Sequence, residues 1–199
     1  MGHYFINDEN LKSEIKEFKI NISDNLFKFK TDNGVFSKGE LDFGTRLLIE
    51  TVLKEKLNGN ILDLGCGYGA IGIIINKVTK LPVDMIDINK RAVHLTKINI
   101  KDNECLNVDC FESDGFLNVK NSYDFIISNP PIRVGKEKLY SLINESRNFL
   151  NKNGKIYLVI RKEQGAKTFI KDFTDKFDIE ILEKKKGFYI ICLKFQKLY

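Results

Sequence analysis

Short apolar segments alternate with longer helical segments along most of this chain after residue 59. The short apolar runs predict strands in residues 60–64, 83–88, 105–112, 124–128 and 155–160. Apolar residues recur at helical spacing in residues 70–80, 90–102, 136–150 and 164–176. Strands that alternate with helices pair in parallel, and the helices cover both faces of the sheet. The pattern therefore predicts an α/β fold with a mostly parallel central sheet.

The C-terminal part departs from this alternation. Residues 178–183 and 188–196 both have the pattern of strands, and only Lys184-Lys185-Lys186-Gly187 separate them. A link this short cannot hold a crossover helix, so the two strands should pair antiparallel. With the upstream runs they predict a Rossmann-like sheet of seven strands with an antiparallel C-terminal strand.

The N-terminal part is expected to form a hairpin and then a helix. Residues 18–31 show strand-like alternation on both sides of Ser23-Asp24-Asn25, which predicts a two-stranded hairpin. Residues 42–57 show an amphipathic helical pattern that ends at Asn58-Gly59. We expect one domain, residues 1–199, in which residues 1–34 are a hairpin extension and residues 35–199 form the core.

The composition is that of an ordinary globular domain, with 43% hydrophobic and 30% charged residues. No apolar run approaches the roughly 20 residues that span a bilayer, and the N-terminus lacks the layout of a signal peptide. We therefore expect a cytoplasmic protein without a membrane partner. The four cysteines form no CxxC pair and have no histidine at ligand spacing, so no metal is expected. A net charge of +5 permits a polyanionic partner.

The first candidate site is a glycine-rich turn between a predicted strand and a predicted helix. Gly65, Gly67 and Gly69 follow the strand, and Ala70 begins the helix. Glycines let the backbone approach a ligand closely, and the first N–H groups of the helix are unpaired. By itself the turn fits a dinucleotide, S-adenosylmethionine (SAM) or a simple tight turn, so its context must decide.

Two aspartates supply that context. Asp63 ends the strand before the glycines, where its charge would repel a pyrophosphate and attract an ammonium group. SAM carries an ammonium and a sulfonium, so Asp63 favours SAM over a dinucleotide. Asp87 ends the next strand, beside Ile88, and can accept hydrogen bonds from the ribose hydroxyls of either cofactor. The alternative for Asp87 is to cap the following helix, a position for which Asn89 competes.

A third acidic position follows the next predicted strand. Asp114 could accept a hydrogen bond from the adenine amino group of the cofactor, with Gly115 beside it. Asp-Gly is also a common turn, so this pair carries little weight by itself.

The most informative segment is a buried strand that ends in Ser128-Asn129-Pro130-Pro131, followed by Ile132. Two successive prolines fix the backbone and donate no N–H, which leaves the carbonyl groups of the loop free as acceptors. The Asn129 side-chain oxygen and the Pro130 carbonyl could each accept one hydrogen of a planar amino group. These two hydrogen bonds would turn the nitrogen lone pair toward a sulfonium methyl and would stabilise the positive charge that develops on the nitrogen. Methylation of an exocyclic amine, without a metal, is the predicted chemistry.

These stretches together resemble the class I SAM-dependent methyltransferases, and Ser128–Pro131 resembles the branch that methylates amino groups of adenine, guanine or glutamine. Gly34–Ser37 and Leu41–Leu48 are similar to the segment before the glycine turn in the RsmC-like family of "small" methyltransferase domains, which methylates guanine N2 in 16S ribosomal RNA. The resemblance begins near Val35 and extends to the C-terminus. It implies SAM as cofactor and ribosomal RNA, or the small ribosomal subunit, as partner.

The resemblance also assigns roles to individual positions. The positions implied for the cofactor are Asp63, Gly65, Gly67, Gly69, Asp87, Ile88, Asp114, Gly115 and Asn129, and those implied for the catalytic loop are Asn129, Pro130, Pro131 and Ile132. Those implied for the substrate are Phe36, Lys38 and Arg133. Basic residues that could contact RNA, or could simply be solvated surface charges, are Lys28, Lys30, Lys38, Arg133, Lys136 and Lys184–Lys186.

Ile132 departs from the pattern of related enzymes. Adenine and glutamine methyltransferases commonly have an aromatic residue after the prolines, so Ile132 disfavours those two acceptors. The alternatives to a guanine N2 methyltransferase are an adenine N6 or protein glutamine N5 methyltransferase, a non-catalytic SAM- or RNA-binding module, and an NAD-dependent oxidoreductase.

Overall fold

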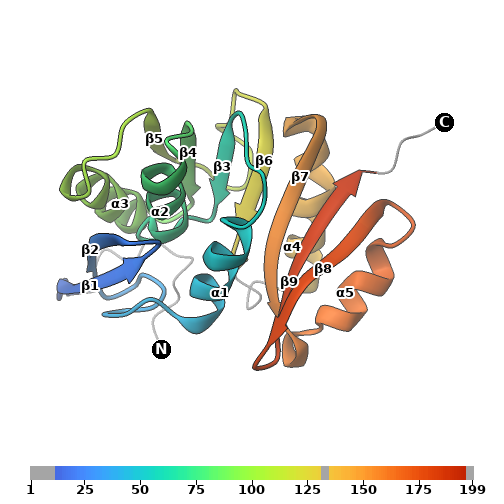
Figure 1. The fold of residues 1–199 in the computed structure, drawn as a ribbon, viewed down its shortest axis with the longest axis horizontal. Coiled ribbons are helices and arrows are strands. Elements are labelled where there is room, and N and C mark those ends of the chain that lie inside the picture. The colour runs from blue at the N-terminus through green and yellow to red at the C-terminus, as the bar shows by residue number, and fades with distance from the viewer. Residues whose placement is uncertain (1–11, 131–134, 196–199) are drawn as a thin grey trace.

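The computed structural model describes residues 12–130 and 135–195, which form a central sheet and a separate hairpin (Figure 1). The central sheet has seven strands in the order β5-β4-β3-β6-β7-β9-β8. Its strands are β3 (Ile61–Leu64), β4 (Val83–Asp87), β5 (Val108–Glu112), β6 (Tyr123–Ser128), β7 (Leu150–Arg161), β8 (Phe177–Lys185) and β9 (Phe188–Phe195). The pairs from β5 to β7 are parallel, and β9 is antiparallel to both of its neighbours. The predicted fold class is confirmed, including the antiparallel strand near the C-terminus.

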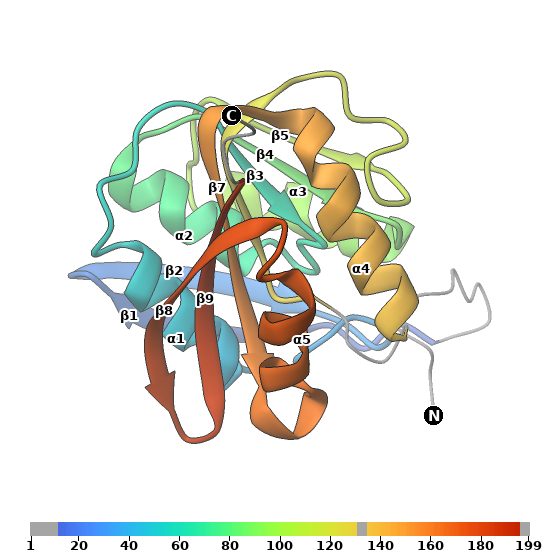
Figure 2. The same ribbon diagram turned by 90° about the vertical axis from the view of Figure 1, so that its right-hand side faces the viewer.

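Helices cover both faces of this sheet, as Figure 2 shows. On one face lie α1 (Phe43–Val52), α2 (Ala70–Thr79) and α3 (Lys90–Asp102). On the other lie α4 (Lys136–Glu145) and α5 (Ala166–Phe173), with the 3₁₀ helices η2 (Ser146–Phe149) and η3 (Lys162–Gln164) beside them in the chain. Within the described residues, no helix is long and apolar enough to cross a membrane.

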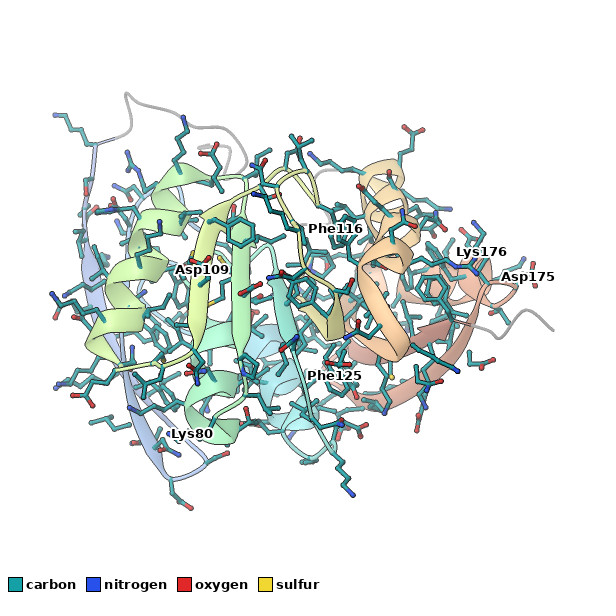
Figure 3. The ribbon with its side chains drawn as sticks, turned by 90° about the horizontal axis from the view of Figure 1, so that it is seen from above. Lys80, Asp109, Phe116, Phe125, Asp175 and Lys176 are labelled. Atoms are coloured by element: carbon teal, nitrogen blue, oxygen red, sulfur yellow. The ribbon has the colours of Figure 1, made fainter. Side chains whose placement is uncertain are left out.

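The sheet separates two hydrophobic clusters because successive residues of a strand point to opposite faces. In β3, Ile61 belongs to the cluster under α1, α2 and α3, whereas Leu62 belongs to the cluster under α4 and α5. Phe125 of β6 belongs to the cluster under α1, α2 and α3, and Phe116, in the loop after β5, belongs to the cluster under α4 and α5; both are labelled in Figure 3. Strands buried on both faces explain why the predicted runs are almost uniformly apolar.

Some predicted boundaries are wrong at helix ends. The helix predicted over residues 42–57 ends at Val52, because Lys54 and Glu55 donate to carbonyls three residues back and close a tighter turn. The helix predicted over 136–150 ends at Glu145 and continues as η2. The strand predicted over 155–160 is longer and begins at Leu150.

The N-terminal hairpin of β1 (Lys16–Ile22) and β2 (Asn25–Thr31) is packed into the core rather than extending from it. Phe27 and Phe29 are fully buried, and Phe29 lies edge-to-face against Tyr68 of the glycine turn, with 5.5 Å between the ring centroids. The two-residue turn Ser23-Asp24 has positive φ at both positions, as a hairpin turn of type I′ requires. The hairpin therefore contacts the segment in which the first candidate site lies.

Two buried asparagines, Asn99 of α3 and Asn103 at its C-cap, bond the backbone of β2 as a neighbouring strand would. Asn99 accepts from the Lys30 N–H at 2.8 Å and donates to the Lys30 carbonyl at 3.0 Å. Asn103, one turn later, accepts from the Lys28 N–H at 3.0 Å and donates to the Lys28 carbonyl at 2.7 Å. Four helical residues rise by about 6 Å and two strand residues by about 7 Å, so these two contacts match in spacing.

We expect Asn99→Ala to lower the free energy of unfolding by about 1–3 kcal/mol, because it leaves the Lys30 N–H and the Tyr68 carbonyl without their partner. Urea denaturation followed by circular dichroism measures this loss. Lys97→Ala, at an exposed position on the same helix, is the control and should change stability far less. Equal stability of the two variants would contradict the role assigned to Asn99.

Candidate functional site

A cavity of about 600 Å³ opens at the carboxyl edge of the central strands. β3 pairs with both β4 and β6, so the chain turns toward opposite ends of the sheet from this point. In open α/β sheets such a switch point leaves a crevice in which ligands bind, and cavities of this size hold small molecules. The segments that line it are residues 35–38, 64–68, 86–89, 113–115 and 128–130, with parts of α1, α4, β7 and β9.

The glycine turn lines this cavity with open backbone. Gly65 and Gly67 have φ of 76° and 59°, and no atom lies within 4 Å of the position that a Cβ would occupy at either residue. A side chain there would occupy cavity space. Gly69 differs, because a Cβ at this position would lie 2.8 Å from Thr96 Cγ2. The first two glycines thus suit contact with a ligand, and the third allows α2 to pack against α3.

Asp87 places a carboxylate at the cavity wall beside the glycine turn. One oxygen accepts from the Gly67 N–H at 2.9 Å and the other from the Asn89 N–H at 2.8 Å. Burial raises the pKa of Asp87, and these backbone N–H groups oppose that shift. Asn89 caps α3 by accepting from the N–H groups of Arg91 and Ala92, so the alternative cap role for Asp87 is wrong. Ile88 also lines the cavity.

Asp63 lies behind the glycine turn and is fully buried, outside the lining of the cavity. Its Oδ2 accepts from the Gly72 N–H at 2.9 Å, and its Oδ1 is buried without a hydrogen-bond partner among the described residues. β3 is covered on both faces, so a residue at this position points under α2 rather than into solvent. Asp63 is not among the residues that line the cavity, and its predicted contact with a ligand ammonium stays a prediction.

The loop after β5 brings Asp114 and Gly115 to the cavity. Asp114 Oδ1 is 3.0 Å from the Lys138 ammonium of α4, and both side chains are about half exposed. Exposed ion pairs of this kind contribute little to stability and exchange readily. Asp114 thus remains available as an acceptor at the end of the cavity nearest α4.

The end of β6 brings Ser128, Asn129 and Pro130 to the cavity. The Ser128 hydroxyl is buried and donates to the Leu64 carbonyl at 2.6 Å, which ties this loop to the strand that precedes the glycine turn. Asn129 Nδ2 donates to the Thr45 hydroxyl oxygen at 2.8 Å. Pro131, Ile132 and Arg133, which were also predicted site residues, lie outside the described residues.

The two predicted substrate residues that are described differ in character. Phe36 lines the cavity with half of its surface exposed, so its ring is available to a ligand. Lys38 also lines it, but its ammonium bonds Glu14 at 2.6 Å and Asn33 at 2.7 Å. Lys30 and Lys136 are likewise paired, with Asp102 and Asp172. The sequence gives no sign of these pairings, because the partners are distant in the chain.

An aromatic and cationic rim was missed by the sequence analysis. Phe43 of α1 and Phe188 of β9 line the cavity with 5.5 Å between ring centroids. Arg161 lies over the Phe188 ring at 4.9 Å, and Lys186 lies over the Phe43 ring at 4.9 Å. Only Lys186 was predicted, from the basic run that contains it. The rim combines residues from α1, β7, β9 and the turn before β9, so no local motif could reveal it.

The side chains around the cavity suit an organic ligand. Across residues 12–130 and 135–195, no group of three or more His, Cys, Asp or Glu side chains is arranged to hold a metal ion. Asp87 and the glycine turn offer a carboxylate and open backbone, and Asn129 lines the same cavity. The oxygens of Asp87 and Asn129 are hydrogen-bond acceptors, which suit a cofactor with ribose hydroxyls and a second ligand with an amino group.

Residues 26–192 match the family described as "Methyltransferase small domain". The chain is 40% identical over 196 residues to "Uncharacterized protein YbxB" of Bacillus subtilis, with 96% of this chain and 98% of that protein covered. It is 37% identical over 153 residues to ribosomal RNA small subunit methyltransferase C of Psychromonas ingrahamii, with 74% of this chain and 43% of that protein covered. The chain thus spans less than half the length of the curated methyltransferase C relative.

The fold is also similar to that of a solved structure. The Thermus thermophilus 16S rRNA N2 G1207 methyltransferase (RsmC), in complex with AdoMet and guanosine, matches with a TM-score of 0.80 and 22% identity. The match covers 94% of this chain and 52% of the solved chain.

We expect the stability of the protein to fall between about pH 4 and pH 7 through Asp63. Burial raises the pKa of Asp63 from 3.8 to about 7, so the stability that protonated Asp63 provides below pH 4 is lost as the pH rises through 7. Three pKa units correspond to roughly 4 kcal/mol. Asp63→Asn should flatten this dependence, and exposed Asp175→Asn should not. Urea denaturation of the wild type and the two variants at pH 4 to 8 measures how the free energy of unfolding depends on pH. The same pH dependence in the wild type and Asp63→Asn would exclude the shifted Asp63 pKa.

Proposed function

The chain belongs to the methyltransferase small domain family, and from this membership we propose that it methylates the exocyclic N2 amine of a guanine in 16S ribosomal RNA. It is a SAM-dependent methyltransferase; the guanine acceptor and the RNA partner are the parts proposed here. The observation that supports the proposal best is the position of Asn129 and Pro130, at the wall of the same cavity that contains the open glycine turn. A cofactor methyl and an amino group could meet between them.

The glycine-turn side of the cavity is proposed to hold the cofactor. Gly65 and Gly67 leave open space, Asp87 and Ile88 stand where a ribose would lie, and Asp114 with Gly115 stands where an adenine would lie. Asp63 is proposed to act indirectly, by holding the start of α2 through Gly72. When bound, SAM supplies a methyl group activated by its sulfonium.

The β6 side of the cavity is proposed to hold the amine. The Asn129 side-chain oxygen and the Pro130 carbonyl each accept one amino hydrogen, so the nitrogen lone pair points across the cavity. Methyl transfer would break the bond between the methyl carbon and the sulfonium sulfur, which leaves as a thioether, while the nitrogen bonds to that carbon. The same two oxygens would stabilise the positive charge that the nitrogen gains. The nitrogen then releases one proton to water. Pro131 and Ile132 remain proposed members of this loop.

The rim is proposed to contact the RNA around the target. Phe43 and Phe188 offer apolar ring surface, and Arg161 and Lys186 offer positive charge beside them. Aromatic and arginine side chains stack on unpaired bases, and cations contact phosphates. Phe36 is exposed nearby, and Arg133 remains a candidate that the described residues do not include. Ribosomal RNA, or the small ribosomal subunit, is therefore the proposed partner, and the cytoplasm the proposed location.

The acceptor is tested by incubating the protein with isotopically labelled SAM and either naked 16S RNA or small subunits from cells that lack the protein. Nucleoside mass spectrometry should then find label in N2-methylguanosine. Label in N6-methyladenosine, or in glutamine of ribosomal protein, would replace guanine with that acceptor. Absence of label in RNA and protein alike would favour the non-catalytic binding module.

We expect Asn129→Ala to abolish methyl transfer while the SAM dissociation constant stays within a few fold, because Asn129 is proposed to act mainly on the amine. Losing one such polar group typically lowers kcat by about 10²–10³. Transfer of labelled methyl groups and calorimetric titration with SAM measure the two effects. Asn21→Ala, at an exposed position of the hairpin, is the matched control. Normal turnover by Asn129→Ala would rule out the catalytic role.

Asp87→Ala should weaken SAM binding by about 1–2 kcal/mol, because the carboxylate is proposed to accept from the ribose hydroxyls. Calorimetry with SAM measures the change, and titration with NAD tests the oxidoreductase alternative in the same experiment. Asp109→Ala, an exposed aspartate on the neighbouring strand, should bind SAM as the wild type does. An unchanged affinity of Asp87→Ala would exclude the ribose contact.

A further inference from the structure

We propose that Asp42 and Thr45, at the start of α1, are positioning residues that orient the Asn129 carboxamide for the incoming amine. The three side chains form a chain of hydrogen bonds from the helix cap to the cavity wall. This inference rests on the proposed function, since it deepens the role assigned to Asn129. It gives a role to residues of Leu41–Leu48, a segment linked to the substrate only by its similarity to the RsmC-like family.

The direction of the chain follows from counting hydrogens. The Thr45 hydroxyl has one hydrogen, which it donates to Asp42 Oδ2. A carboxylate accepts and cannot donate, so the hydroxyl oxygen has only lone pairs left for its second neighbour. That neighbour, Asn129, must therefore present its NH₂ group, and it does so at 2.8 Å.

The consequence is that the Asn129 oxygen is turned away from Thr45. Within the part of the chain that the structure describes, no group donates to this oxygen, and Asn129 lines the cavity. The reverse orientation would present two N–H donors to an amine that itself donates, and it would repel the amine. An asparagine side chain can rotate between these orientations, so a fixed donor–acceptor pattern behind it has catalytic value.

The start of α1 is built to hold this pattern rigidly. Asp42 Oδ1 caps the helix by accepting from the N–H groups of Gly44 at 3.0 Å and Thr45 at 3.1 Å. Thr45 is 6% exposed. Gly44 packs against β9 so closely that a Cβ would lie 2.6 Å from Phe188 Cε1. Oδ1 of Asp42 thus caps the helix, whereas Oδ2 accepts the hydrogen bond from the Thr45 hydroxyl. We call the chain from Asp42 Oδ2 through Thr45 to Asn129 the relay.

Thr45→Val tests the relay with a side chain of the same shape. We expect kcat to fall about tenfold or more, while the KM for SAM stays within about twofold, because the lost orientation matters once the amine is bound. Thr45→Ser retains the hydroxyl and should restore most of the activity. Thr51→Val is the matched control: the same substitution on the same helix, at a buried hydroxyl without a partner among the described residues, should leave kcat unchanged.

Asp42→Asn tests the direction of the chain while the cap remains, because asparagine caps helices as well as aspartate does. With its oxygen on the cap, the substituted carboxamide would place its NH₂ group beside Thr45 and donate to the hydroxyl oxygen. The Thr45 hydrogen would then point to Asn129, whose carboxamide would have to reverse. We expect kcat to fall as in Thr45→Val, with an unchanged thermal midpoint. If both variants keep wild-type kcat, the relay is wrong.

A measurement without an acceptor separates this inference from the proposed function. In ¹⁵N NMR spectra of the free protein, the Asn129 side-chain hydrogen bonded to Thr45 should exchange slowly with water, and Thr45→Val should make it exchange at least about tenfold faster. If wild-type protein methylates no guanine but this contrast holds, the acceptor is wrong and the relay stands. Equal exchange in both proteins overturns the relay whatever the acceptor.

Discussion

The parallel pairing of β3 with β6 is the constraint on which the rest of the site depends. Parallel strands end at the same edge of a sheet, so the turn after β3 and the loop after β6 open side by side. The chain leaves these strands toward opposite ends of the sheet, and the crevice between the two exits is the cavity. The Ser128 hydroxyl, bonded to the Leu64 carbonyl, ties the two exits together. The two segments proposed to hold the cofactor and the amine therefore lie at the same edge of the sheet.

Polar side chains at α1 and α3 form hydrogen bonds that join these helices to other parts of the fold. Asn99 and Asn103 satisfy the outer edge of β2 and thereby attach the hairpin to α3. Thr45, held by the Asp42 cap, bonds Asn129 in a similar way at the other wall. Buried polar groups of this kind stabilise a structure only when each partner is present, which makes them specific. They connect the N-terminal part of the chain to the catalytic core.

Asp63 and Asp87 lie at or next to the ends of β3 and β4, yet they differ in their burial and in their contacts. Asp87 lies at the cavity wall with both oxygens on backbone N–H groups, which oppose the rise in its pKa that burial causes. Asp63 is fully buried, one of its oxygens has no hydrogen-bond partner among residues 12–130 and 135–195, and burial raises its pKa to about 7. Its sequence position suggested direct contact with a cofactor ammonium. In the fold Asp63 accepts from the Gly72 N–H of α2 and its raised pKa makes stability depend on pH, while its contact with a ligand ammonium stays a prediction.

The sequence by itself determined the fold class and the glycine turn, because periodicity and glycine act through the local backbone. The chemistry that the two prolines suggest for the Asn129–Pro130 loop stays a prediction. The sequence placed Asp87 and Asn129 at strand ends, and strand ends of a parallel sheet converge. It did not reveal that Lys38 is paired with Glu14, or that Phe43, Phe188 and Arg161 form one rim. Only the tertiary structure decided those contacts, since they join residues far apart in the chain. For the same reason, the bond from Thr45 to Asn129 became visible only in the folded molecule.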